Sequence, residues 1–63
     1  MDELIKNRKL VGMTQFQLSI ASGIPIARIT FAETGRLKLT KVELASIKEA
    51  IRKRAKEIAT VLA

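Results

Sequence analysis

The sequence contains no cysteine, no histidine, no tryptophan and no tyrosine. Without cysteine the chain has no disulfide and no thiolate metal site, and without histidine it lacks the commonest metal ligand and general base of proteins. Its carboxylates offer no pair placed for acid–base work. We therefore expect no enzymatic activity, no metal, no cofactor and no small-molecule substrate.

Aromatic side chains are also scarce, at 3% of the 63 residues, whereas hydrophobic residues make up 48%. A core of Ile, Leu, Val and Ala is typical of helical packing and argues against an aromatic-rich β-sandwich. A chain of this length forms one small domain, which buries roughly 60% of its unfolded surface. The composition thus predicts a single all-α domain over residues 1–63.

Positive charge dominates, since twelve Lys and Arg against six Asp and Glu leave a net charge of +6. Such a field favours nucleic acid or an anionic membrane surface as the partner. No segment approaches the ~20 apolar residues of a membrane span, and residues 1–9 lack the apolar core of a secretory signal. We therefore expect a cytoplasmic, nucleoid-associated protein that spans no membrane, while the charge alone leaves both partners open.

Glycines and threonine caps mark the predicted helix boundaries. Three glycines each follow a stretch with helical apolar spacing, where a helix ends in a residue with positive φ: Gly12, Gly23 and Gly35. Two segments have the residues of a capping box, in which a threonine and a Gln or Glu bond to each other's backbone amides: 14–17 and 40–43. Together these signals predict helices over about 2–11, 15–22, 26–33 and 41–62.

The two middle helices are too short to be stable alone, because isolated helices below roughly 12–15 residues are marginal in water. Apolar packing against the outer helices must hold them. The residues available for this packing are Leu18, Ala21, Ile24, Ile29 and Ala32. Two short helices joined by a glycine-bearing turn form a helix-turn-helix motif, here over about residues 14–34.

Further residues before, within and after this motif keep a distinctive spacing: Leu4, Arg8, Gly12, Met13, Thr14, Gln15, Leu18, Ala21, Gly23, Ile24, Ile29, Glu33, Gly35, Arg36, Leu44, Ala45 and Ile47. Through them, residues 4 to about 51 resemble the Cro/phage-repressor (XRE) family of helix-turn-helix regulators. The resemblance implies a lambda-repressor-like domain of four to five helices. It also implies a transcriptional regulator of the repressor type that binds double-stranded DNA and no membrane. Helix 15–22 would be its positioning helix, and helix 26–33 the recognition helix, which enters the major groove.

The resemblance implies structural roles for several polar residues. Arg8 would pair with Glu33 and fix the angle of the recognition helix; the alternative is that both side chains are solvated. Gln15 would brace the recognition helix and contact a phosphate; the alternative is an exposed polar residue beside the cap. A helix N-terminus attracts anions through its amides and its dipole, which favours a phosphate near Thr14 and Gln15.

Base recognition would belong to the start of the recognition helix: Pro25, Ile26, Ala27, Arg28, Thr30 and Phe31. Arg28 would bind a guanine or hold a phosphate, and Thr30 would hydrogen-bond to a base or a phosphate. Relatives commonly carry polar residues where this chain has Ile26, Ala27 and Phe31. Apolar groups contact a thymine methyl but supply no hydrogen-bond code, and the alternative for Ile26 and Phe31 is partial burial.

Arg36 and Lys38 lie in the next loop, which in this family runs beside the DNA backbone. Both would hold phosphates, and such contacts add affinity and salt dependence without specificity. Lys6 and Lys9 on the first helix are weaker candidates for the same role.

The last predicted helix, 41–62, carries an apolar stripe with approximately heptad spacing. Its second half extends past what so small a domain shelters, so we expect a homodimer that matches an operator with two half-sites. The residues assigned to dimerisation are Ile51, Ala55, Ile58, Val61 and Leu62. The alternative is that this half folds back against the first helix of the same chain.

A basic cluster at residues 52–56 lies within this helix. It would form a second contact with the DNA backbone or, the interpretation we favour, a solvated face supported by a pair between Glu49 and Lys53. The main rival to DNA binding is a protein-interaction module, antitoxin-like or adaptor, on the same fold, and the apolar Ile26 and Phe31 favour it. A helix that lies on a membrane surface ranks third.

Overall fold

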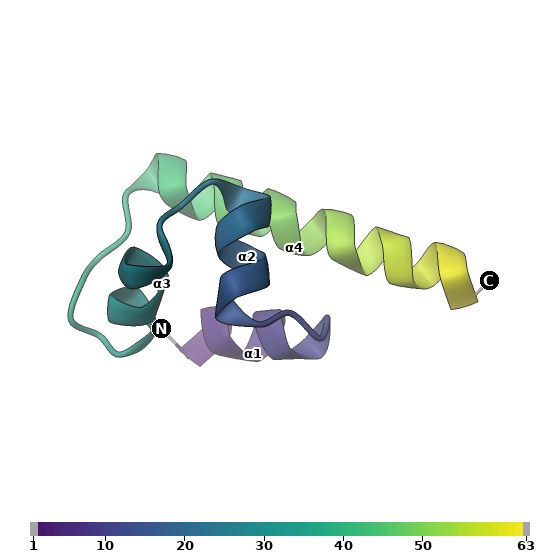
Figure 1. Cartoon of the computed structure of the whole chain (residues 1–63), viewed down its shortest axis with the longest axis horizontal. Coiled ribbons are helices and arrows are strands. Elements are labelled where there is room, and N and C mark those ends of the chain that lie inside the picture. The colour runs from purple at the N-terminus through teal and green to yellow at the C-terminus, as the bar shows by residue number, and fades with distance from the viewer. Residues whose placement is uncertain (1, 63) are drawn as a thin grey trace.

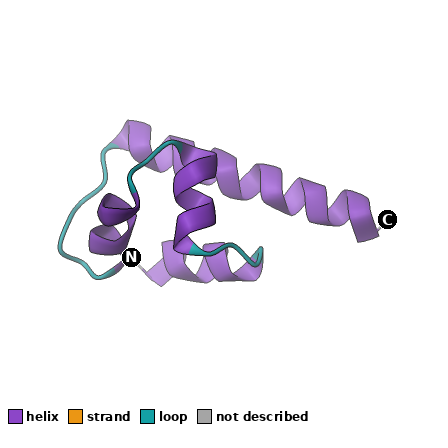
Figure 2. Ribbon diagram, in the orientation of Figure 1, coloured by secondary structure: helices purple, strands orange, loops and turns teal. Residues whose placement is uncertain are grey.

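The computed structural model describes residues 2–62 and contains four helices. They are α1 (Asp2–Leu10), α2 (Gln15–Ser22), α3 (Ile26–Glu33) and α4 (Lys41–Leu62). Within the described residues there is no strand, so the predicted all-α class is confirmed (Figure 2). Three helices have the predicted bounds, and α1 ends one residue early. Over the same residues, no helix has the length and apolarity that crossing a membrane requires.

The longest helix, α4, determines the shape of the molecule. Its 22 residues make a rod about 33 Å long, which accounts for the principal extents of 39 × 19 × 18 Å. The other three helices lie along its first half, and its C-terminal turns project beyond them (Figure 1). The short helix α2 packs against both α3 and α4, and therefore sits at the centre of the fold.

Both predicted capping boxes are present. At the start of α2, the Thr14 hydroxyl accepts a hydrogen bond from the Gln17 amide (3.0 Å), and Gln17 Oε1 accepts one from the Thr14 amide (2.9 Å). Thr40 and Glu43 make the same exchange at the start of α4, at 3.1 and 2.9 Å. α2 ends at Gly23, whose φ of 75° favours glycine, and this left-handed residue turns the chain toward α3.

One apolar cluster joins the four helices. Its buried members are Leu4, Val11, Met13, Leu18, Ile24, Ile29, Ala32, Leu39, Ile47 and Ala50. Leu18 on α2 and Ile29 on α3 have no exposed surface. The two short helices are therefore held by burial of apolar area, as predicted.

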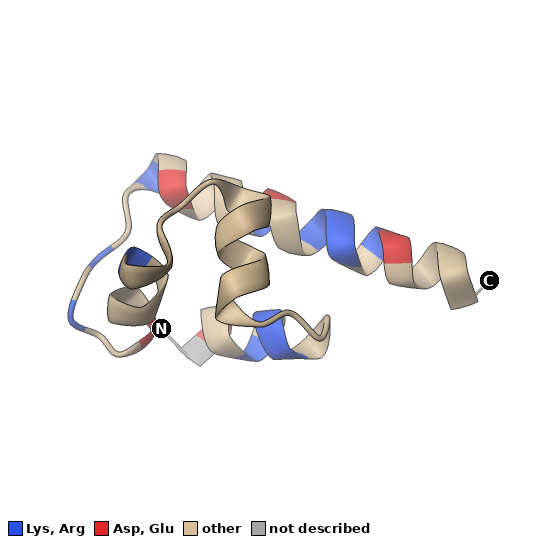
Figure 3. Cartoon of the chain, viewed as in Figure 1, with Lys and Arg blue, Asp and Glu red and all other residues tan. Residues whose placement is uncertain are grey.

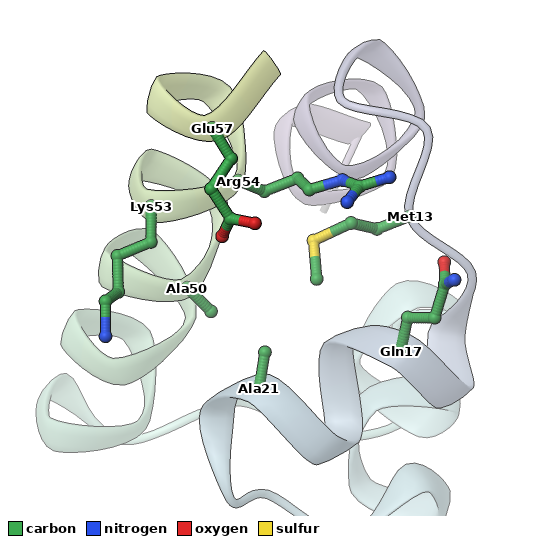
Figure 4. Close-up of a pocket in the computed structure, with 7 residues that line it drawn as sticks. All are labelled: Met13, Gln17, Ala21, Ala50, Lys53, Arg54 and Glu57. Atoms are coloured by element: carbon green, nitrogen blue, oxygen red, sulfur yellow. The ribbon is translucent and has the colours of Figure 1, made fainter. Parts of the chain in front are cut away.

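Ala21 is the exception among the residues expected to hold the short helices, because it is exposed. It lies on the side of α2 that faces an open hollow of about 320 Å³ beside α4, where it points toward Ala50 (Figure 4). The prediction for Ala21 was wrong because its methyl group faces this open hollow rather than the core.

The apolar stripe of α4 is divided between the core and the surface. Its partly buried members, which pack against the core, are Leu44, Ile51 and Ile58. Ala55 is exposed, and Val61 and Leu62 are 83% and 81% exposed. Of the residues assigned to dimerisation, Ile51 and Ile58 are thus partly engaged within their own chain, and the exposed apolar surface gathers at the end of α4.

Candidate nucleic-acid interface

Arg8 and Glu33 form an ion pair between α1 and the end of α3. Arg8 Nε donates to Glu33 Oε2 at 2.7 Å, and Arg8 Nη2 donates to Glu33 Oε1 at 3.0 Å. The two side chains are only 10% and 5% exposed. Arg8 Nη1 also donates to the Met13 carbonyl at 2.8 Å. The predicted pair is confirmed, and it ties the end of α3 to α1 and to the loop before α2.

Gln15 connects α2 to this pair. Its Nε2 donates to Glu33 Oε1 at 2.8 Å, and its Oε1 accepts a hydrogen bond from the Thr30 hydroxyl at 3.0 Å. The bracing role predicted for Gln15 is confirmed, while its contact with a phosphate stays a prediction. Thr30 donates its hydroxyl toward α2 and thus belongs to this network, so its contact with DNA also stays a prediction.

The network controls the ionisation of Glu33. Burial by itself would raise the pKa of Glu33, but the hydrogen bonds from Arg8 and Gln15 and the charge of Arg8 outweigh it, so the pKa lies below its ordinary value. Glu33 is therefore a carboxylate at neutral pH, and its contribution to stability is lost as the pH falls through this lowered pKa.

The opposite side of α3 is open to solvent. We define the outer face of α3 as Pro25, Ile26, Ala27 and Phe31, all of which are exposed. Ile26 is 42% exposed and Phe31 is 45% exposed, so both are partly covered and yet available to a partner. The predicted base-contacting residues thus separate into this outer face, the inward-facing Thr30, and Arg28.

Arg28 is engaged by Glu43, a residue whose only predicted role was in the capping box at 40–43. Its Nε donates to Glu43 Oε2 at 2.6 Å, and its Nη2 donates to Glu43 Oε1 at 2.8 Å, which joins α3 to the start of α4. Hydrogen bonds from Arg28 and from the Thr40 amide lower the pKa of Glu43 to about 2. Fifteen positions separate Arg28 from Glu43, so no local pattern in the sequence indicated this pair.

A shallow hollow of about 470 Å³ lies beside the outer face of α3. Its lining residues are Ala27, Arg28, Phe31, Arg36 and Leu37. The structure therefore brings Arg28 and Arg36 to one apolar concavity. Lys38 is exposed in the same loop but does not line the hollow.

Positive charge lies on α1, α3 and α4 and in the loop after α3, whereas α2 carries no charged residue (Figure 3). The basic cluster of α4 lies on its projecting half, away from α3 (Figure 3). Thr14 is exposed at the N-terminus of α2, where its hydroxyl is used by the cap.

The basic cluster of α4 makes different contacts from those predicted. Glu49 pairs with Arg52, at 2.6 Å from Nη2 and 2.9 Å from Nε, rather than with Lys53. The planar guanidinium bonds both carboxylate oxygens at once, which an ammonium group does not match. Arg54 Nε donates to the Val11 carbonyl at 3.4 Å, so this residue also links α4 to the loop after α1.

Comparison of the chain with models of protein families, with curated protein sequences and with solved structures finds no match. The resemblance to XRE regulators therefore rests on the residues and spacing of the sequence alone.

Proposed function

We propose that this chain is a sequence-specific DNA-binding transcriptional regulator of the repressor type, located at the nucleoid in the cytoplasm. The observation that carries the proposal is the way α3 is held. Ile29 and Ala32 fix it to the core and Glu33 fixes its end, while its outer face stays open. A helix held from one side and exposed on the other suits insertion into the major groove.

The charge distribution supports the same partner. The net charge of +6 attracts a polyanion, and the exposed Arg36 and Lys38 follow α3 directly. Thr14 and Gln15 lie at the N-terminus of α2, where backbone amides favour a phosphate. No covalent bond changes in this mechanism, because Lys and Arg displace counterions from phosphates while α3 contacts bases.

Selection from a random pool of duplexes is expected to return a preferred site, and Arg36→Ala and Lys38→Ala are each expected to weaken binding to it. Removing one phosphate contact lowers the slope of log affinity against log salt concentration by about 1. The loss is expected to be equal for preferred and random duplexes, because phosphates carry no sequence information. Fluorescence anisotropy of labelled duplexes over a salt series measures both quantities.

Lys56→Ala is the matched control, because it removes the same charge from an exposed position on the far half of α4. A slope lowered as much by Lys56→Ala as by Lys38→Ala would place the basic cluster of α4 on the DNA. If no duplex binds even at low salt, the proposal of DNA binding is overturned.

We propose in addition that the chain acts as a homodimer joined through the exposed end of α4. Val61→Glu and Leu62→Glu are expected to weaken self-association more than about tenfold, because they bury an unpaired charge in the interface. Sedimentation equilibrium measures this change. Thr60→Glu adds the same charge on the side of the helix away from Ile58 and Leu62 and is expected to weaken association less than either of those two variants. A wild-type protein that stays monomeric at high concentration would contradict the dimer.

A second candidate function is a protein-interaction module. Phe16 and Ile20, one turn apart on α2, are 62% and 67% exposed, and Ile26 and Phe31 add apolar surface on α3. A protein partner captured in the absence of DNA, together with no duplex binding at low salt, would favour this function over the first.

A further inference from the structure

Arg28 is held in place before any ligand arrives. Glu43 accepts two hydrogen bonds from the Nε and Nη2 edge of the guanidinium. A guanidinium has five N–H donors, so three remain, on Nη1 and on the end-on side of Nη2. The side chain of Arg28 is 39% exposed, whereas that of Glu43 is 19% exposed. Arg28 is thus the more exposed member of the pair, and three of its five donors are not used by Glu43.

This arrangement favours a base over a phosphate as the ligand of Arg28. The pair of Arg28 and Glu43 has no net charge, and a phosphate placed against it would face a nearby carboxylate. The O6 and N7 atoms of guanine are neutral acceptors that match the end-on edge of a guanidinium. Because Arg28 is already ordered, binding also requires less loss of side-chain freedom.

The surroundings of Arg28 favour a methyl group beside that guanine. Ala27, Phe31 and Leu37 line the same hollow as Arg28, and Ala27 and Phe31 belong to the outer face of α3. In the major groove, the 5-methyl of thymine is the apolar group that such side chains contact. None of the four side chains of the outer face carries a hydrogen-bond donor or acceptor. The donors that line the hollow beside it belong to Arg28 and to Arg36, which is assigned above to a phosphate.

We propose that Arg28 and the neighbouring outer face of α3 together recognise a guanine adjacent to a thymine. Arg28 binds the guanine, Ala27 and Phe31 contact the thymine methyl, and Glu43 positions Arg28. This inference rests on the proposed DNA-binding function and specifies which two neighbouring bases the protein would recognise. Glu43 acts through Arg28 and does not itself contact the base.

Glu43→Gln separates this positioning role from the cap of α4. Glutamine also serves in a capping box, so the helix start is kept while the charged partner of Arg28 is removed. Glu49→Gln is the matched control, because Glu49 lies on the same helix and its ion pair with Arg52 is exposed. Both variants raise the net charge by one, and thermal unfolding followed by circular dichroism verifies that both stay folded.

The ratio of affinity for the preferred duplex to affinity for a random duplex is expected to fall about tenfold in Glu43→Gln and to stay unchanged in Glu49→Gln. If Glu43→Gln instead strengthens binding to both duplexes by the same factor, beyond that of Glu49→Gln, then Glu43 competes with DNA for Arg28 and the inference is overturned.

Modified duplexes test the same inference with the wild-type protein. Uracil in place of the contacted thymine removes one methyl and is expected to weaken binding about fourfold. Replacement of guanine N7 by carbon is expected to weaken it further. A preferred duplex that tolerates both changes would overturn this inference alone, whereas the absence of any preferred duplex would overturn the proposed function.

Discussion

Replacing either partner of the buried pair is expected to produce the largest loss of stability in this chain. Arg8→Met or Glu33→Met is expected to lower the free energy of unfolding by about 3–5 kcal/mol, because each leaves a buried charge without its partner. A domain of this size has a total stability of about 3–9 kcal/mol. Each single variant is therefore expected to be largely unfolded in a mild denaturant that leaves the wild type intact.

The double variant, Arg8→Met with Glu33→Met, is expected to lose less stability than the two single losses combined, because it leaves no uncompensated charge. Urea unfolding followed by far-ultraviolet circular dichroism measures all three variants, since the chain has no tryptophan or tyrosine to report by fluorescence. Arg52→Met removes a partner from an exposed pair and is expected to leave the urea midpoint almost unchanged. If Arg8→Met and Arg52→Met lower the urea midpoint equally, burial of the ion pair makes no difference to the cost of breaking it.

The same variants are expected to change the acid sensitivity of the fold. The pKa of Glu33 is lowered in the folded state, so its stabilising contribution is complete above the ordinary glutamate range and is lost as the pH falls through the lowered pKa. In the double variant this part of the acid dependence is expected to disappear. The part due to Glu43, whose pKa is about 2, is expected to remain.

The starts of α2 and α4 and the end of α2 could be predicted from the sequence because each is decided locally. The bonds between Thr14 and Gln17 and between Thr40 and Glu43 join positions three residues apart. Gly23 ends α2 through its own backbone conformation. Signals between positions so close in the chain do not depend on tertiary contacts, which is why the bounds of α2 and the start of α4 agree with the prediction.

The contacts that place α3 depend on residues distant in the chain. Arg8 and Glu33 are 25 positions apart, and only the resemblance to a known family indicated their pair. Glu43 has two roles, because its carboxylate bonds the Thr40 amide and also Arg28. A local pattern reveals the first role and conceals the second. The exposure of Ala21 likewise depends on how far α4 lies from α2.

Two isoleucines on α3 allow its buried and outer sides to be tested with one chemical change. Ile29→Ala is expected to lower the free energy of unfolding by about 2–5 kcal/mol, because Ile29 is fully buried and its removal leaves a cavity. Ile26→Ala, on the outer face, is expected to lower it by less than about 1 kcal/mol, because Ile26 is already 42% exposed. Urea unfolding measures both.

Binding is expected to show the opposite order. Ile26→Ala removes apolar surface that would face the major groove, so its affinity for the preferred duplex is expected to fall while its fold is kept. Ile29→Ala is expected to bind normally once its affinity is corrected for the folded fraction, because its side chain contacts only the core. If Ile29→Ala instead loses affinity for the preferred duplex and Ile26→Ala keeps it, the outer face of α3 takes no part in recognition. DNA contact would then belong to another surface, such as the basic second half of α4.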